Sequence, residues 1–312
     1  MRDINLPLPV ARVVLRPIYR VTLNERMPWR LQRLLLDIGS RAQPLPAGTR
    51  VHKLRLGGRP AERITAGSES QRGAADAAGG AVLYLHGGGY AVGSLATHRS
   101  LAARLAHETG CTVYVLDYRL APEHPFPAGL DDAEMAFLEL VESVGYRPDR
   151  IALAGDSAGG GLSLATAQRL IAQHGHTPAA LGLIAPWTDP NRIPERDRDL
   201  VISKPWSRAC AAAYLGGGDS TDPGYAPLTG ELHGLPPTYV QVDKSELLHT
   251  QCVDFVADLR AAGAHVRFTE TQGLWHVAQL QAALVAPAAA ALTELAEFLR
   301  EAIQPVSKRD LG

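Results

Sequence analysis

The pentapeptide Gly-Asp-Ser-Ala-Gly at residues 155–159 contains the serine whose surroundings most favour nucleophilic chemistry. It lies between an apolar run that ends at Ala154 and a helical run that begins near Ala158. This is the G-x-S-x-G pattern in a strand-turn-helix context, in which a sharp turn presents the serine hydroxyl above the end of a sheet. The context argues against a chance occurrence. We therefore predict that Ser157 is a nucleophile, with partial positive charge from the start of the next helix beside it.

A second motif, His-Gly-Gly-Gly-Tyr, occupies residues 86–90 directly after another apolar run. Three consecutive glycines allow backbone amides to approach a ligand closely, and such loops supply oxyanion-hole donors. We predict that the amides of Gly87, Gly88 and Ala158 donate to an oxyanion. A phosphate-binding loop is the alternative, but neither Gly-Lys-Ser/Thr nor G-x-G-x-x-G spacing is present. Asp156 is expected to satisfy neighbouring backbone donors.

Strand-like and helix-like runs alternate along the part of the chain that carries both motifs. The predicted strands are residues 81–85, 111–116, 151–154, 180–185, 238–242 and 265–270. The predicted helices lie near residues 95–109, 128–144, 158–173, 250–262 and 287–302. This alternation predicts an α/β fold with a parallel sheet and helices on both faces.

Four segments fall outside this rhythm. Residues 10–38 have apolar side chains at helical spacing and predict one or two amphipathic helices. A basic amphipathic segment is able to contact anionic lipid, but several prolines divide it, so packing on the domain or a role as a lid is favoured. Residues 51–65 predict an antiparallel hairpin, residues 67–80 a polar glycine-rich loop, and residues 186–236 an insertion above the sheet.

The two motifs and the stretch between them, DYRLAPEHPFPA at residues 117–128, form a combination with a known counterpart. Over about residues 80–300 the chain resembles the hormone-sensitive-lipase-like group of bacterial esterases, within the α/β-hydrolase fold. The resemblance implies an eight-stranded, mostly parallel sheet with helices on both faces and a helical cap. It also implies hydrolysis of carboxylic esters without a cofactor or a metal.

The resemblance further implies a division of the chain into a catalytic domain and a cap. The cap would consist of residues 1–45 and an insertion at residues 187–230. The α/β-hydrolase domain would then consist of residues 46–186 and 231–312.

The general base is expected after the serine, because the chain order in this fold is Ser, Asp or Glu, His. The candidates downstream of Ser157 are His174, His176, His233, His249, His265 and His276. His276 lies in the loop between the last predicted strand and the last predicted helix, where the resemblance places the catalytic histidine. We predict that His276 is the base.

Two carboxylates, Asp243 and Glu246, compete for the role of the triad acid in the loop after residues 238–242. Many members of the group have D-P-L-R-D-E here, whereas this chain reads VDKSELLHTQ. Alignment from Ala262-Gly263, which matches the end of the following helix in the group, puts Glu246 at the first aspartate. We predict Glu246 as the acid. Asp243 remains the alternative, and otherwise caps the next helix.

These residues together predict a serine esterase. Ser157 would attack the ester carbonyl while His276 takes its proton, and water would then cleave the acyl-enzyme. The expected substrates are small esters with short- to medium-chain acyl groups. An amide, formamide or lactone hydrolase on the same triad is an alternative, as is a ligand-binding homologue without catalysis, which the intact motifs argue against. Four aromatic residues would either line the substrate pocket or pack in the cap: Trp187, Trp206, Tyr214 and Trp275.

Composition narrows the class of protein. The 312 residues are 46% hydrophobic and 20% charged, which is typical of a folded globular protein. A net charge of −1 argues against nucleic acid as a partner. The charge is uneven, however, because residues 1–50 contain nine arginines and only three acidic residues. A homodimer is left open.

Three features point to the cytoplasm. Three widely spaced cysteines suggest neither a disulfide framework nor a zinc site. Arg12 and Arg16 interrupt what would be the apolar run of a signal peptide. No uninterrupted apolar run reaches about 18 residues, so stable membrane insertion is not expected.

Overall fold

A computed structural model of the chain describes residues 6–67 and 79–304. Its centre is an eight-stranded sheet with the strand order β1-β2-β4-β3-β5-β6-β7-β8. The strands are β1 (Thr49–Leu56), β2 (Arg59–Ala66), β3 (Ala81–Leu85), β4 (Thr112–Leu116), β5 (Ile151–Asp156), β6 (Leu181–Ile184), β7 (Thr238–Asp243) and β8 (Val266–Thr271). Strand β2 pairs antiparallel with β1 and β4, and all other neighbours are parallel. The predicted hairpin and the mostly parallel sheet are confirmed, whereas most of the predicted loop at residues 67–80 lies outside the described residues.

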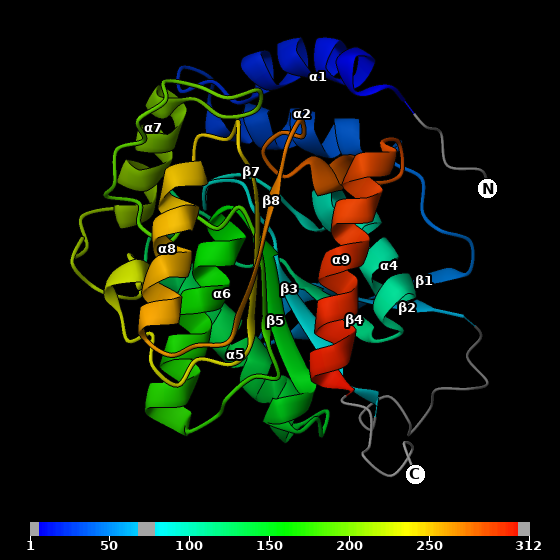
Figure 1. Ribbon diagram of the computed structural model, residues 1–312, viewed down its shortest axis with the longest axis vertical. Coiled ribbons are helices and arrows are strands. Elements are labelled where there is room, and N and C mark those ends of the chain that lie inside the picture. Colours follow the sequence, from blue (N-terminus) through cyan, green and yellow to red (C-terminus); the bar gives the residue numbers. More distant parts are fainter. Residues whose placement is uncertain (1–5, 68–78, 305–312) are drawn as a thin grey trace.

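Helices cover both faces of this sheet, as predicted (Figure 1). They are α4 (Leu95–Thr109), α5 (Ala128–Glu142), α6 (Ala158–Arg169), α8 (His249–Ala261) and α9 (Ala286–Ile303). Helices α4 and α9 pack together on one face, and α5, α6 and α8 lie on the other. Strands β3, β4 and β5 are buried along their whole length. This two-sided burial explains why their sequences are continuous apolar runs rather than alternating ones.

The first predicted cap segment lies at the end of the sheet where the parallel strands finish (Figure 1). The second segment starts there, but its last residues run down beside α6, where Gln168 donates to the Pro227 carbonyl at 2.9 Å. The first contains α1 (Leu8–Thr22) and α2 (Trp29–Ser40), in agreement with the predicted amphipathic helices. The second contains α7 (Lys204–Leu215), which the sequence analysis did not identify. Local signals for α7 are present, because Ser203 caps its first turn and Gly216 ends it in the left-handed conformation. In the described part of the chain, no helix is long and apolar enough to cross a membrane.

The turn from β5 into α6 is tightly packed against β3. A Cβ added to Gly159, in the first turn of α6, would overlap the carbonyl oxygen of Leu85 and lie 2.6 Å from that of His86. Both neighbours are backbone atoms of the chain leaving β3, so neither moves without disturbing the sheet. Glycine is therefore required here by close approach of two backbones.

We expect Gly159→Ala to lower the free energy of unfolding by about 1–3 kcal/mol, because the added methyl group overpacks a rigid contact. Urea denaturation followed by circular dichroism measures this. The matched control is Gly39→Ala in α2, where an added Cβ meets nothing within 4 Å. That change should leave stability unchanged or raise it by up to about 1 kcal/mol. Equal stability of the two variants would contradict the close packing at Gly159.

Candidate active site

Ser157 occupies a strained turn at the carboxyl end of β5. Its backbone has φ 52° and ψ −121°, a left-handed conformation that side chains rarely adopt. The turn is held by backbone hydrogen bonds, since the Ser157 amide donates to the Ile184 carbonyl at 2.8 Å and the Ser157 carbonyl accepts from the Trp187 amide at 2.8 Å. This geometry raises the hydroxyl above the sheet and directly precedes the first turn of α6, as the motif predicts.

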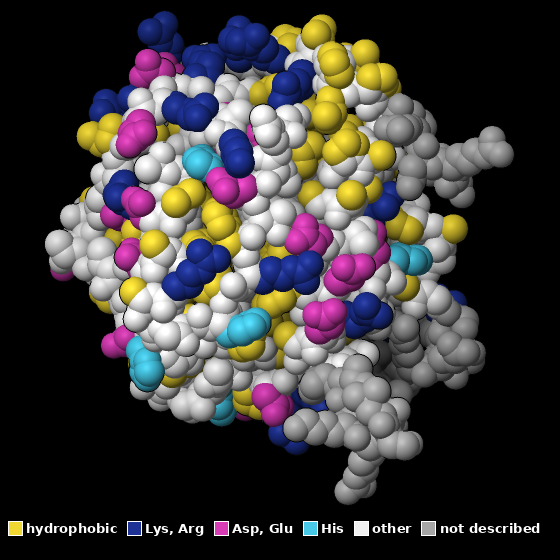
Figure 2. Space-filling model, viewed as in Figure 1, with side chains coloured by type: hydrophobic (Ala, Val, Ile, Leu, Met, Phe, Trp, Pro, Cys, Tyr) yellow, Lys and Arg dark blue, Asp and Glu magenta, His cyan; other side chains and the backbone are white. Residues whose placement is uncertain are grey.

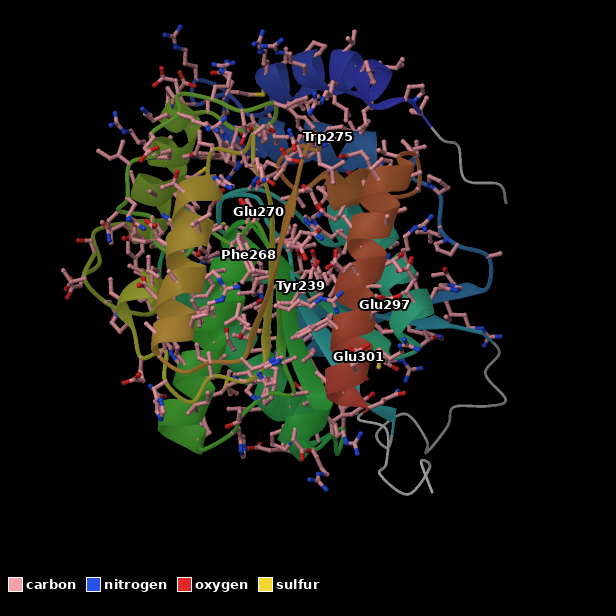
Figure 3. The ribbon with its side chains drawn as sticks, viewed as in Figure 1. Tyr239, Phe268, Glu270, Trp275, Glu297 and Glu301 are labelled. Carbon is pink, nitrogen blue, oxygen red and sulfur yellow. The ribbon has the colours of Figure 1, made fainter. Side chains whose placement is uncertain are left out.

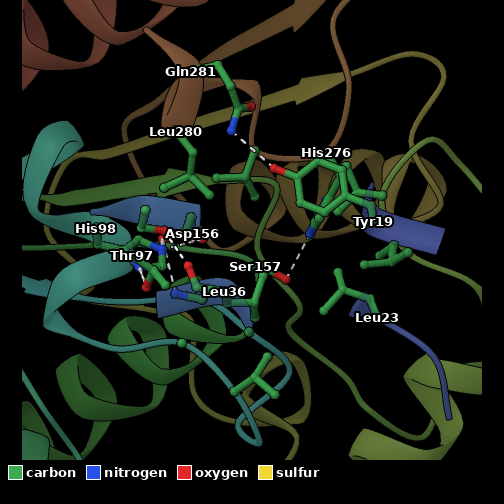
Figure 4. A pocket seen from close by; sticks show the side chains of 18 of the residues that line it. Tyr19, Leu23, Leu36, Thr97, His98, Asp156, Ser157, His276, Leu280 and Gln281 are labelled. Atoms are coloured by element: carbon green, nitrogen blue, oxygen red, sulfur yellow. Dashed lines mark hydrogen bonds and ion pairs between the residues drawn. The ribbon is translucent and has the colours of Figure 1, made fainter. Parts of the chain in front are cut away.

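The structure brings Ser157, His276 and Glu246 into one line of hydrogen bonds. His276 Nε2 lies 2.9 Å from Ser157 Oγ (Figure 4), and His276 Nδ1 lies 2.6 Å from Glu246 Oε2. Because a carboxylate only accepts, Nδ1 carries the ring proton and donates it to Glu246. Nε2 is then free to accept from the serine hydroxyl. All three side chains are buried, so bulk water does not weaken the contacts.

Glu246 reaches His276 because its own loop is fixed. Its other oxygen, Oε1, accepts a hydrogen bond from the Asp243 amide at 2.7 Å. The hydrogen bonds of the competing carboxylate, Asp243, go to other partners than His276. Asp243 Oδ1 accepts from the Ser245 amide at 3.0 Å, and Oδ2 accepts from the Leu274 amide at 2.8 Å.

Asp243 therefore joins the loop after β7 to the loop that carries His276. Its predicted role as a cap of the next helix is wrong. Helix α8 begins at His249, and its capping position is Leu248, which makes no side-chain cap. The sequence placed Asp243 in the right loop, but only the fold brings the Leu274 amide to it.

Opposing effects set the charge of the pair. Burial by itself would lower the pKa of His276, but the hydrogen bond and the negative charge of Glu246 outweigh it, so the pKa lies above the ordinary 6.5. Burial raises the pKa of Glu246, and the contact with His276 offsets part of that rise. A protonated His276 is thus stabilised where a buried imidazolium would otherwise be costly.

The glycine loop after β3 is held by Asp156. The Gly87 amide and the Tyr84 hydroxyl both donate to Asp156 Oδ1, at 3.1 Å and 2.9 Å. His98 Nε2 also lies 3.1 Å from that oxygen. The predicted role of Asp156 in satisfying a backbone donor is confirmed.

The same contact corrects the assignment of Gly87 as an oxyanion donor, because its amide is already paired. Among the described residues, by contrast, the amides of Gly88, Gly89 and Ala158 have no hydrogen-bond partner. Gly89 was not predicted. The motif identified the loop, whereas the choice among its glycines depends on the Asp156 side chain, which spacing alone does not reveal.

His86 supports this loop as a neutral ring. Burial and the nearby His98 lower the pKa of His86 to about 3. Its Nδ1 donates to the Gly87 carbonyl at 2.8 Å, and its ring stacks on Tyr118 with centroids 4.4 Å apart. The histidine of the motif is therefore structural.

A cavity of about 110 Å³ opens beside the serine and histidine (Figure 4). Its lining residues from the predicted cap segments are Tyr19, Leu23, Leu36, Ser40, Gln43, Val201, Ile202 and Trp206. Sequence analysis predicted only Trp206 of this set. Tyr19 lies on the inward side of α1 and Leu23 lies at its end. The sequence does not show which side of α1 faces inward, so these two residues are identified only once the packing of α1 is known.

The other three aromatic residues do not line this cavity, which favours packing, the second alternative, over the pocket assignment. Tyr214 stacks on Tyr90 with centroids 3.7 Å apart, and Trp187 lies beside the same ring. Trp275 lies at the end of β8 (Figure 3) and packs in a cluster with Ala11 of α1. Their burial reflects packing between the cap segments and the sheet.

Helix α1 also braces the histidine loop directly. The Arg12 guanidinium donates to the Gly273 carbonyl at 2.7 Å and to the Leu274 carbonyl at 3.2 Å. Gln281 donates to the Tyr19 hydroxyl at 3.1 Å. Burial raises the pKa of Tyr19 to about 12, so this hydroxyl stays neutral.

A buried hydroxyl, an imidazole, a carboxylate and free backbone amides are thus gathered at one end of the sheet. This arrangement suits acyl transfer, in which a base activates a hydroxyl and amides stabilise the resulting oxyanion. Within residues 6–67 and 79–304, no cluster of three or more His, Cys, Asp or Glu side chains is placed to hold a metal ion.

Comparison with known proteins gives the family. A family model described as the alpha/beta hydrolase fold matches residues 82–280. An esterase of Acinetobacter venetianus is 33% identical over 272 residues, which cover 85% of this chain and 87% of that esterase. An acetyl-hydrolase of Streptomyces hygroscopicus is 39% identical over 204 residues, which cover 64% of this chain and 68% of that protein.

Among solved structures, an esterase from the bacterial hormone-sensitive lipase family is similar to this chain with a TM-score of 0.87 and 35% sequence identity. The match covers 95% of this chain and 98% of that esterase. Similarity in both sequence and structure over most of the chain shows that the protein belongs to the α/β-hydrolase family, among its hormone-sensitive-lipase-like esterases.

Proposed function

We propose that this carboxylic ester hydrolase cleaves small esters by covalent catalysis, with Ser157 as nucleophile, His276 as general base and Glu246 as the triad acid. The observation that carries the proposal is the buried line of hydrogen bonds from Glu246 through His276 to Ser157. Such a line activates a hydroxyl that is otherwise a weak nucleophile at neutral pH.

In the proposed reaction, Ser157 Oγ attacks the ester carbonyl while His276 Nε2 takes the hydroxyl proton. Glu246 stabilises the resulting imidazolium and keeps the ring in the reactive tautomer. The amides of Gly88, Gly89 and Ala158 stabilise the oxyanion. His276 then gives its proton to the leaving alcohol, and a water molecule activated by the same ring cleaves the acyl-enzyme.

The proposed substrates carry short- to medium-chain acyl groups. The cavity is about 110 Å³ and mainly apolar, which favours small acyl chains. The Streptomyces relative is named an acetyl-hydrolase, which supports the same size range. We also propose that residues 1–45 and 187–230 form the cap, because the described part of each segment contributes to the cavity wall, as Tyr19 and Trp206 do.

The serine assignment is tested by Ser157→Ala. The variant should lose at least about 10³-fold in kcat toward p-nitrophenyl acetate and butyrate, because no other group replaces the nucleophile. A matched control is Ser163→Ala, which removes a buried hydroxyl that donates to the Gly159 carbonyl in the same helix. The control should keep activity near that of the parent protein. Substantial activity in Ser157→Ala would refute the mechanism.

The acid assignment is tested by comparing Glu246→Gln with Asp243→Asn. Loss of the Glu246 charge should lower kcat by up to about 10⁴-fold. It should also move the acid limb of the pH profile of kcat/KM to lower pH, because Glu246 is the main group that raises the pKa of His276.

Asp243→Asn should leave that limb in place, since Asp243 acts only on the loops. The assignment is overturned if the acid limb moves in Asp243→Asn and not in Glu246→Gln.

A further inference from the structure

The outward side of α1 is an apolar stripe with nothing packed on it among the described residues. The stripe consists of residues at helical positions i, i+3, i+4, i+7, i+8 and i+11, namely Val10, Val13, Val14, Pro17, Ile18 and Val21. The valine and isoleucine side chains are 48–74% exposed. A helix that already packs its other side on the domain has no structural need for such a stripe, so a second apolar surface indicates a binding face.

Exposed arginines flank this stripe. Arg16 and Arg20 lie on α1, and Arg26, Arg30 and Arg41 follow on the next segment. Glu25 is the only exposed acidic residue among residues 6–43. In the space-filling view, hydrophobic side chains and arginines gather side by side at the end of the molecule formed by α1 (Figure 2).

We propose that the outer face of α1 binds peripherally to anionic phospholipid bilayers. The apolar stripe would enter the boundary between headgroups and acyl chains, and Arg16 and Arg20 would pair with lipid phosphates. The helix would lie in the plane of the surface and keep its inner contacts with the domain. This inference goes beyond ester hydrolysis and does not depend on it.

Charge distinguishes a lipid surface from a second copy of the chain. A symmetric dimer through α1 would bring the same surface of each copy together. Arg16 and Arg20 would then approach their own counterparts, and within residues 6–43 Glu25 is the one exposed acid that could compensate. An anionic bilayer instead offers negative charge for the flanking arginines and an apolar layer for the stripe.

The bound orientation would also bring the active-site end of the molecule to the lipid. The inner side of α1 supplies Tyr19 to the catalytic cavity and Arg12 to the loop of His276. Ester substrates that partition into a bilayer would then be concentrated at the end of the sheet that carries Ser157.

The test is co-sedimentation of the full chain with vesicles. We expect binding to vesicles of equal parts phosphatidylglycerol and phosphatidylcholine to exceed binding to pure phosphatidylcholine by about tenfold or more at low ionic strength. Salt at about 0.5 M should remove most of this difference, because it screens charges beyond a few ångströms. Equal binding to the two vesicle types, or no binding to either, would overturn the proposal.

Two matched pairs of variants locate the surface. Arg16→Glu should lower the partition coefficient about tenfold or more, whereas Arg260→Glu on α8, an exposed site with the same charge change, should have little effect. Val14→Glu should weaken binding strongly, whereas Met135→Glu on α5 should not, although Val14 and Met135 are 54% and 52% exposed.

All four variants should keep the parent hydrolysis of a water-soluble ester, which reports that they fold. Equal losses of vesicle binding within either pair would contradict binding through α1. Sedimentation velocity tests whether a second copy of the chain covers this face of α1 instead. A dimer that Val14→Glu dissociates, together with no preference for anionic vesicles, would show that the face binds a second copy and would overturn the lipid proposal.

Discussion

The buried contact between His276 and Glu246 is the interaction on which the rest of the site depends. Placing two ionisable groups away from water is costly unless each finds a partner with good geometry. Here the N–H group at Nδ1 of His276 donates a hydrogen bond to Glu246 Oε2 at 2.6 Å. Glu246 Oε1 accepts a second hydrogen bond, from the Asp243 amide. The pair leaves Nε2 facing Ser157. Two loops that follow β7 and β8, far apart in sequence, must therefore be held to within a hydrogen-bond length.

The fold meets that requirement from two directions. On the side of the sheet, the neighbouring parallel strands β7 and β8 bring their following loops to the same edge. There Asp243 links the two loops by accepting a hydrogen bond from the Leu274 amide. On the side of helix α1, Arg12 donates hydrogen bonds to the loop that carries His276, and Tyr19 lines the cavity. The helix that lines the cavity beside Ser157 thus also braces the loop of His276, the proposed base. Under the proposed mechanism, movement of α1 would alter both substrate binding and catalysis.

Much of this was predictable from the sequence, and the exceptions have physical reasons. The buried strands are continuous apolar runs, and the elbow around Ser157 has a strict local pattern, so both were identified correctly. Gly87 was misassigned because the Asp156 side chain occupies its amide, a contact across the turn that spacing does not encode. For Tyr214 and Trp275 the sequence leaves pocket lining and packing as alternatives, because aromatic type does not distinguish packing from substrate contact. Helix α7 was missed because its short run lies among prolines and glycines.

The most direct test of this account is a nitrogen NMR titration of the His276 ring in the parent protein. The buried contact with Glu246 predicts that the neutral ring carries its proton on Nδ1 and titrates above 6.5. A neutral ring protonated on Nε2, or a pKa at or below 6.5, would contradict the claim that Glu246 sets the tautomer and basicity of His276.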